Sequence, residues 1–176
     1  MKIIIFIILI FFISINISLA KDYIYILNSK ESNEIYNNAI NHFKTSQISV
    51  FKDIRGVVIS FYIEDLEQDY TNFSKKTIQN LEKIEYFLAK NKNPVIIEVH
   101  TTEIPLENSK NLKNWEISTI IANKIEVFLR KRVHFSNLEI KSVGYGEFMP
   151  SKNTPNNGVK NKGRVDIIIL CSINGE

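Results

Sequence analysis

The sequence is poor in cysteine and histidine, which limits the chemistry that it can support. Cys171 is the only cysteine, so no disulfide can form within the chain, and its apolar surroundings predict a small buried side chain. The three histidines lie far apart, so the close ligand spacing of a zinc site is missing. We therefore predict no metal and no cofactor, and we expect His100 to have a structural role at the end of a strand.

The chain also lacks a large excess of charge and a recognisable catalytic motif. It has 22 basic and 19 acidic residues, a net charge of +3, and the basic residues are spread along the chain. Binding of nucleic acid is therefore not expected. There is no Gly-x-Ser-x-Gly turn, no pairing of cysteine with histidine and no carboxylate pair in a catalytic context. We predict that the protein is not an enzyme and has no catalytic residues.

A long apolar run occurs at the N-terminus. Lys2 is followed by aliphatic and phenylalanine residues from 3 to 13 and by a short tail with small residues that leads to Ala20. This pattern predicts a secretory signal peptide, residues 1–20, with cleavage after Ala20. Its removal takes away one basic residue, which leaves 21 basic against 19 acidic residues and a net charge of +2. The alternative is an uncleaved anchor, which would be the contact of the chain with a membrane, because residues 3–19 approach the length of a spanning helix.

Residues 21–55 are rich in asparagine and lysine and are predicted to be an N-terminal extension. Within them, residues 31–43 are expected to form a short helix. Its predicted inward face consists of Ile35, Ala39, Ile40 and Phe43.

Residues 56–171 are predicted to form one domain from four strands and two helices. Runs of β-branched and aromatic residues predict strands at residues 57–63, 95–100, 138–143 and 164–170. Apolar residues that recur every three or four positions predict a helix capped by Ser74 and a second helix capped by Asn114 that ends near Arg132. Gly144 and Gly146 predict a turn. The order βαβαββ predicts an α+β fold of two layers, with the helices packed on one face of a mixed sheet.

Four short blocks within this domain resemble one family. Residues 98–102 read EVHTT, residues 114–118 read NWEIS, residues 144–147 read GYGE with Pro150 after them, and residues 158–166 read GVKNKGRVD. In this order the blocks resemble the OmpA C-terminal domain family, which includes MotB and Pal and has the patterns IEGHTD, NWxLSxxRA, GYGExxP and NxxxxGRAxNRRVD. The resemblance implies a periplasmic, OmpA-like domain of the cell envelope or outer membrane that binds the stem peptide of peptidoglycan noncovalently, commonly at diaminopimelate. The implied pocket lies between the end of the second strand and the second helix.

The two charged residues of that pocket are replaced in this chain. The aspartate of the family corresponds to Thr102 and the arginine corresponds to Ile121, while Val99 stands in place of a glycine. In the last block, residues 159, 162 and 163 also depart from the pattern, whereas residues 164–166 match it. Because the two charges pair with the ammonium and carboxylate of the ligand, losing both would weaken binding on the order of a thousandfold.

Two hypotheses follow from these replacements. In the first, the pocket is retuned to a stem peptide whose third residue lacks the distal carboxylate, as lysine or ornithine does, and Glu103 supplies the missing acid. In the second, the domain has ceased to bind the wall and serves as a scaffold or binds a protein partner in the envelope. Under the second hypothesis Glu103 is a solvated loop carboxylate and Ile121 is part of the apolar stripe of its helix.

The predicted ligand-binding residues are Thr101, Thr102, Glu103, Asn114, Ser118, Ile121 and Arg164. Asn114 and Ser118 lie one helical turn apart and face the same way, although capping alone explains Asn114. Arg164 is available to a ligand carboxylate or to an ion pair with a nearby acid. We expect Trp115 to pack in the core; the alternative is that it stacks on a ligand.

Overall fold

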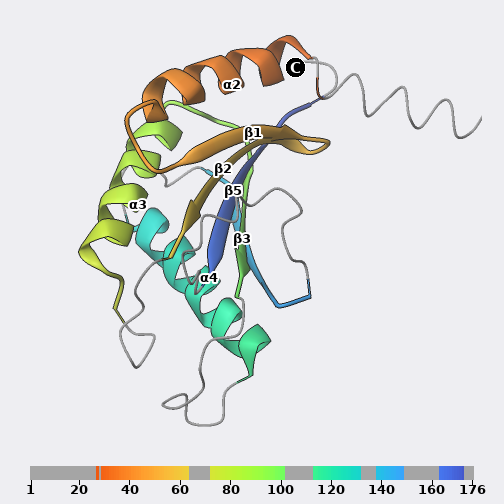
Figure 1. Cartoon of the computed structure of the whole chain (residues 1–176). Helices are drawn as coiled ribbons and strands as arrows, with labels where there is room; N and C mark the ends of the chain where they lie inside the picture. The colour runs from red at the N-terminus through yellow and green to blue at the C-terminus, as the bar shows by residue number, and fades with distance from the viewer. Residues whose placement is uncertain are drawn as a thin grey trace, which may run out of the picture.

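The computed structural model describes residues 27, 29–63, 72–101, 113–131, 138–148 and 163–172. The predicted signal peptide, residues 1–20, lies outside them. The elements are α2 (Lys30–Phe43), β1 (Ser49–Asp53), β2 (Gly56–Tyr62), α3 (Lys75–Leu88), β3 (Val95–His100), α4 (Asn114–Arg130), β4 (Ile140–Gly146) and β5 (Arg164–Leu170) (Figure 1). From β2 onward this is the predicted βαβαββ order. Within the described ranges, no helix is both long enough and apolar enough to cross a bilayer.

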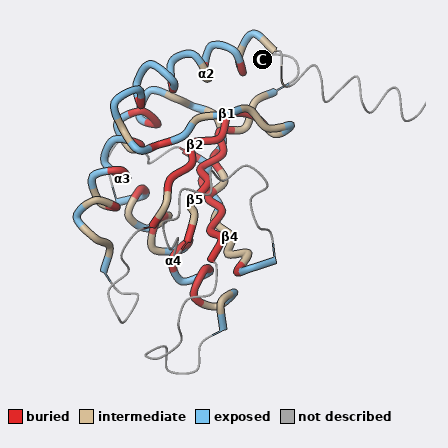
Figure 2. The backbone as a smooth tube through the Cα atoms, viewed as in Figure 1, coloured by how far each residue is buried: buried red, intermediate tan, exposed pale blue. Residues whose placement is uncertain are grey.

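The strands form one mixed sheet in the order β1-β2-β5-β3-β4. Neighbouring strands are antiparallel except β3 and β4, which are parallel. A parallel pair needs a crossover connection, and α4 supplies it. The helices pack on one face of this sheet, as predicted, and Figure 2 shows that the strands in the middle of the sheet are buried along most of their length.

The core lies between that face of the sheet and the helices. Strand residues alternate between faces, so every second residue of β2, β3 and β5 enters the core. These residues are Val57, Ile59, Phe61, Val95, Ile97, Val99, Val165, Ile167 and Ile169. The helices bury Leu81, Ile84 and Leu88 from α3 and Ile117, Ile121, Ile125 and Leu129 from α4. Ser74 caps α3 as predicted, since its Oγ accepts a hydrogen bond from the Thr77 amide at 3.2 Å.

The segment predicted to be an N-terminal extension contributes α2 and β1 to this sheet and core. β1 pairs with β2 along its whole length. Ile35, Ala39 and Phe43 of α2 are buried, but the predicted inward position of Ile40 is wrong, because Ile40 is 39% exposed. Ile40 lies about 100° around the helix from Ala39, outside the stripe that faces the sheet.

Two predicted boundaries near the end of β4 and the start of α4 are also wrong. β4 continues through Gly144 to Gly146, where a turn was predicted, because the pairing with β3 extends that far. The N-cap of α4 is Lys113 rather than Asn114. The Glu116 carboxylate accepts a hydrogen bond from the Lys113 amide at 2.7 Å, which satisfies the first free donor of the helix.

Candidate functional site

The end of β3 meets the first turn of α4 and the end of β4 at one place. Thr101 directly follows β3 and is buried. Its backbone amide donates a hydrogen bond to the Gly146 carbonyl at 2.9 Å, and its hydroxyl donates to the Asn114 carbonyl at 3.1 Å. One residue therefore holds the three segments together.

Ser118 makes a second connection between α4 and β4. Its side chain is fully buried, its hydroxyl donates to the Trp115 carbonyl at 2.9 Å, and it accepts from the Gly146 amide at 2.9 Å. A buried hydroxyl that is satisfied as donor and acceptor contributes to positioning. Ser118 is thus occupied by the framework of the site.

Glycine is required where β4 approaches α4. A Cβ atom at Gly144 would lie 2.2 Å from the backbone nitrogen of Thr119, and one at Gly146 would lie 2.9 Å from that of Trp115. Gly146 also has a φ of 56°, in the left-handed region that glycine favours. The strand end and the helix are therefore in backbone contact.

Asn114 is the polar side chain of the site that is least constrained. Its Nδ2 donates to Glu147 Oε2 at 3.4 Å. Its Oδ1 is buried and accepts no hydrogen bond from the described part of the chain. The Asn114 side chain therefore places an amide group next to the Glu147 carboxylate.

The structure places the predicted site residues in three different settings. Thr101, from the first block, lies at the start of α4, where Asn114 and Ser118 from the second block are found. Ile121 is 0% exposed and belongs to the core cluster, so its side chain does not reach the surface. Thr102 and Glu103 lie outside the described residues.

Arg164 does not join this group and instead forms an ion pair. Its Nε donates to both carboxylate oxygens of Asp166, at 2.9 and 3.0 Å. Its side chain is 13% exposed, so the pair is mostly buried rather than on the surface. Asp166 also accepts from the Ser60 hydroxyl at 2.6 Å.

A charged network covers the face of the sheet opposite the helices. Arg55 bridges two carboxylates, Asp53 at 2.9 Å and Glu98 at 2.6 Å. His100 Nε2 lies 3.5 Å from Asp166 and 4.0 Å from Glu98. The His100 ring stacks on Tyr145 at 5.3 Å, and the Tyr145 hydroxyl donates to Glu98 at 3.3 Å. The structural role expected for His100 fits this position.

The network shifts the ionisation of its members. Burial by itself raises the pKa of Asp53, but the hydrogen bonds from Arg55 outweigh it and hold that pKa below its ordinary value. The Asp53 hydrogen bond, followed by the Glu98 contacts, raises the pKa of Arg55. Burial and the nearby Glu98 carboxylate raise the pKa of Tyr145. The charges on Asp53 and Arg55 are therefore mutually stabilised.

The same network includes three groups of metal-ligand type. Atoms of Glu98, His100 and Asp166 all lie within 4.8 Å of one another. Both carboxylates already accept hydrogen bonds from guanidinium groups, Glu98 from Arg55 and Asp166 from Arg164. A cation would have to displace those contacts, so the arrangement suits ion pairing better than metal binding.

This network was not predicted from the sequence, because its members lie on different strands. Glu98 and His100 are two residues apart and thus on the same face of β3, and Asp166 is opposite Glu98 in the β3–β5 register. The available signal was a single acidic residue inside the apolar run of residues 165–170. The register of the paired strands must be known before Asp166 can be placed beside Glu98 and His100.

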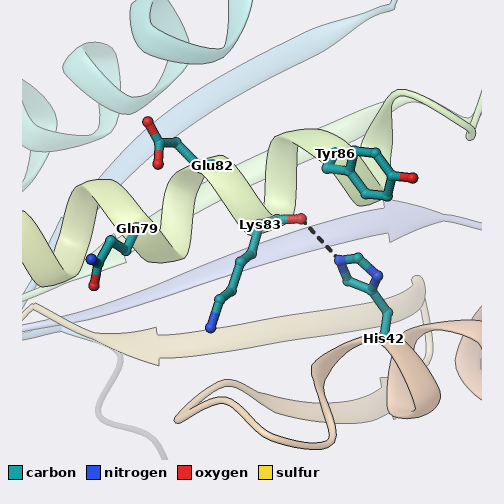
Figure 3. Close-up of a pocket in the computed structure, with 5 residues that line it drawn as sticks. All are labelled: His42, Gln79, Glu82, Lys83 and Tyr86. Atoms are coloured by element: carbon teal, nitrogen blue, oxygen red, sulfur yellow. Dashed lines mark hydrogen bonds between the residues drawn. The ribbon is translucent and has the colours of Figure 1, made fainter.

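A shallow hollow lies elsewhere, between α2 and α3. It has a volume of about 490 Å³ and is lined by His42, Gln79, Glu82, Lys83 and Tyr86 (Figure 3). His42 Nε2 donates to the Lys83 carbonyl at 3.2 Å, and the ring stacks on Tyr86 at 5.8 Å. These contacts join the two helices, and the hollow contains none of the predicted site residues.

No family model matches the chain, and no curated protein matches its sequence. Several solved structures are similar to it. The cell wall anchor of the T6SS from Pseudomonas aeruginosa has a TM-score of 0.62 at 17% identity, over 78% of this chain and 97% of that one. A protein described as MotB-like from Desulfovibrio vulgaris has a TM-score of 0.65 at 14% identity, over 88% and 99%. An outer membrane protein from Borrelia burgdorferi B31 has a TM-score of 0.52 at 29% identity, over 70% and 97%.

The chain has the OmpA-like fold. The MotB-like neighbour carries the name of a member of the family that the four sequence blocks resemble. In this OmpA-like fold, the group formed by Thr101, Asn114 and Ser118 lies between the end of β3 and the start of α4. That is the location of the pocket implied by the resemblance.

Proposed function

We propose that the protein is a noncovalent anchor to peptidoglycan that binds the wall through the region from Thr101 to Ser118. One observation carries the proposal. Thr101, Ser118 and Gly146 are hydrogen-bonded into a fixed framework where β3 ends, although the charges of the family pocket are replaced. A framework that fixes backbone groups around a site lowers the cost of ordering it when a ligand binds.

The ligand in this proposal is a stem peptide without a distal carboxylate at its third residue. The position of the family arginine holds Ile121, which is buried in the core, so no cation is available from it for such a carboxylate. Arg164 pairs with Asp166 and is directed to that acid. A third residue such as lysine or ornithine requires an acid alone, and Glu103 is the candidate.

The protein acts in the periplasm under this proposal. The support is the predicted signal peptide at residues 1–20, together with a fold shared by a cell wall anchor from another bacterium. The mature chain then begins at Lys21. N-terminal sequencing of the protein recovered from its own envelope tests this assignment, because an intact Met1 would contradict cleavage.

The second candidate function is a scaffold or partner-binding role in the envelope without attachment to the wall. The complete burial of Ile121 favours it, because the residue that contacts the ligand in the family has become core. On this alternative, Thr101 and Ser118 stabilise the fold and bind nothing. The two functions predict opposite results with isolated wall material.

Retention of residues 21–176 on purified sacculi separates the two functions. We expect retention on sacculi from its own source organism and weaker retention on a wall that contains diaminopimelate. Asn114→Ala should reduce retention, whereas Asn123→Ala, an exposed position on the same helix, should not. Failure of the unaltered protein to bind either wall would overturn wall anchoring and favour the scaffold function.

A further inference from the structure

Two large aromatic side chains are exposed beside the site. Trp115 in the first turn of α4 is 50% exposed, and Phe148 just after β4 is 76% exposed. The prediction that Trp115 packs in the core is therefore wrong. Exposed aromatic surface is unfavourable in water, and both side chains start from the same end of the sheet, because Phe148 follows two residues after Gly146, whose backbone contacts that of Trp115.

Both residues are attached to the rigid framework of the site. The backbone of Gly146 is in close contact with the backbone of Trp115, and the Gly146 amide is held by Ser118. The Phe148 amide donates to the Tyr145 carbonyl at 3.2 Å, which closes the turn that carries Phe148. The side chains thus project from fixed backbone, so little conformational entropy is lost when they contact a ligand.

The polar groups around the two aromatic residues suit a neutral, hydroxyl-rich ligand. Asn114 and Glu147, which are hydrogen-bonded to each other, supply an amide and a carboxylate. This surface carries one positive charge, on Lys113, and two negative charges, on Glu116 and Glu147. Nucleic acid and anionic lipid head groups need clustered cations, which are missing from this described surface. Sugars instead offer apolar C–H faces to aromatic rings and hydroxyl groups to amides and carboxylates.

We propose that Trp115 and Phe148 form a saccharide contact for an amino-sugar ring of the wall glycan. This inference rests on the proposed wall anchoring and deepens it, since the peptide would bind at the end of β3 and the sugar at the first turn of α4. The class of ligand is an N-acetylated amino sugar in a β-linked chain.

Trp115 is the only tryptophan in the chain, so tryptophan fluorescence reports on the surroundings of this one side chain. Titration of residues 21–176 with the tetramer of N-acetylglucosamine should give a saturable change in emission intensity or wavelength. Phe148→Ala should weaken the apparent affinity about fivefold, as expected for the loss of one aromatic contact. Phe51→Ala, an exposed phenylalanine on β1 at the opposite edge of the sheet, should leave the titration unchanged.

Retention on sacculi separates this inference from the function on which it rests. We expect Trp115→Ala and Phe148→Ala to reduce retention while keeping the unfolding midpoint of the unaltered protein. If the tetramer gives no change in emission and both variants are retained normally, the saccharide contact is overturned and wall anchoring by the peptide stands. If the unaltered protein fails to bind sacculi but the tetramer still changes its emission, wall anchoring fails and the saccharide contact is supported.

Discussion

At the scale of single residues, Ile121 decides how the site differs from the family pattern. Its neighbours in the apolar stripe of α4, Ile117 and Ile125, are equally buried. An arginine at this position would have to reach the surface past them or remain in the core. Position 121 therefore contributes an apolar side chain to the core of this chain and no charge to its surface.

Ile121→Arg should destabilise the protein by roughly 3–5 kcal/mol, since it places an unpaired charge in the core. The matched control is Ile120→Arg, next to it on α4 and 36% exposed, which should change stability by less than about 0.5 kcal/mol. Urea unfolding monitored by circular dichroism measures both. Equal stability of the two variants would mean that α4 can turn or shift to release residue 121.

Gly144→Ala should destabilise the protein by roughly 3 kcal/mol, because the added methyl group would overlap backbone atoms of α4 that cannot move aside alone. Lys141→Ala on the same strand is exposed and should have little effect on stability. Thermal unfolding of the two variants tests this contact. An undisturbed Gly144→Ala protein would show that β4 and α4 are not in backbone contact.

Some side-chain positions could be predicted from the sequence, and others could not. The resemblance implied a site where the first two blocks meet, and Thr101 of the first block does contact the start of α4 in the second, although a ligand-binding role of these residues stays a prediction. The exposure of Trp115 was not predictable, because burial of tryptophan is a statistical tendency that a specific site overrides. The Arg55 network also depends on strand register, which is a long-range property.

At the scale of elements, α2 and β1 complete the sheet and its cover. The Glu31 carboxylate accepts hydrogen bonds from Asn93 Nδ2 and from the Ser172 amide, both at 2.8 Å. The Asn93 contact joins α2 to the segment before β3, and the Ser172 contact joins it to the segment just after β5, 141 residues later in the chain. Helical periodicity predicted α2 itself, but its docking depends on contacts that no local pattern contains.

Phe43→Ala should therefore reduce stability by about 3–5 kcal/mol, the usual cost of removing a buried phenylalanine. Ile40→Ala on the same helix serves as the control, because Ile40 is exposed and its loss should cost little. Guanidinium unfolding gives both free energies. If Phe43→Ala matched its control, α2 would be an appendage rather than part of the cooperative unit.

Glu126 connects α4 to β4, and its ionisation should make that connection sensitive to acid. Burial by itself raises the pKa of Glu126, but hydrogen bonds from Ser142 and Arg130 lower it below the ordinary 4.5. A carboxyl whose pKa is lower in the folded state stabilises the fold above its unfolded pKa, and this contribution is lost as pH falls through the folded pKa.

Glu126→Gln should accordingly lower stability by less than about 1 kcal/mol near neutral pH and by progressively less below pH 4.5. Glu139→Gln, which removes an exposed carboxylate paired with Lys141, is the control and should follow the unaltered protein at each pH. Thermal midpoints across a pH series measure the difference. If the difference in thermal midpoint between Glu126→Gln and the unaltered protein stayed constant at low pH, ionisation of Glu126 would be ruled out as its cause.

At the scale of the whole molecule, the sequence predicted the βαβαββ order because the strand-forming runs, the helical periodicity and the fixed order of the four blocks agree. Runs of β-branched and aromatic residues predicted the strands, and the recurrence of apolar residues every three or four positions predicted α3 and α4. Side chains alternate between the two faces of a strand, so the helix-bearing and charged faces of the sheet can be assigned once the strand order is known. The strand order depends on pairing between segments that are distant in the sequence. The residues that share the helix-free face could therefore not be predicted from the sequence.

The charge of the whole chain bears on the proposed attachment to the wall. After removal of residues 1–20 the net charge is +2, and the two charged contacts of the family pocket are replaced. Non-specific attraction to an anionic wall is therefore weak. Under the proposed function, Glu103 supplies at most one ion pair to the stem peptide, and the proposed contact of Trp115 and Phe148 is uncharged.

Retention on sacculi should consequently fall by less than about fivefold between about 0.1 M and about 1 M NaCl, although the Debye length shortens from about 10 Å to about 3 Å. A strongly basic protein of similar size, which adsorbs by charge alone, is the control and should be released over this range. The retained fraction at each salt concentration, measured after sedimentation, checks the prediction. Salt screens ionic attraction and leaves apolar contacts in place. If this protein were released together with the control, binding through apolar contacts would be contradicted.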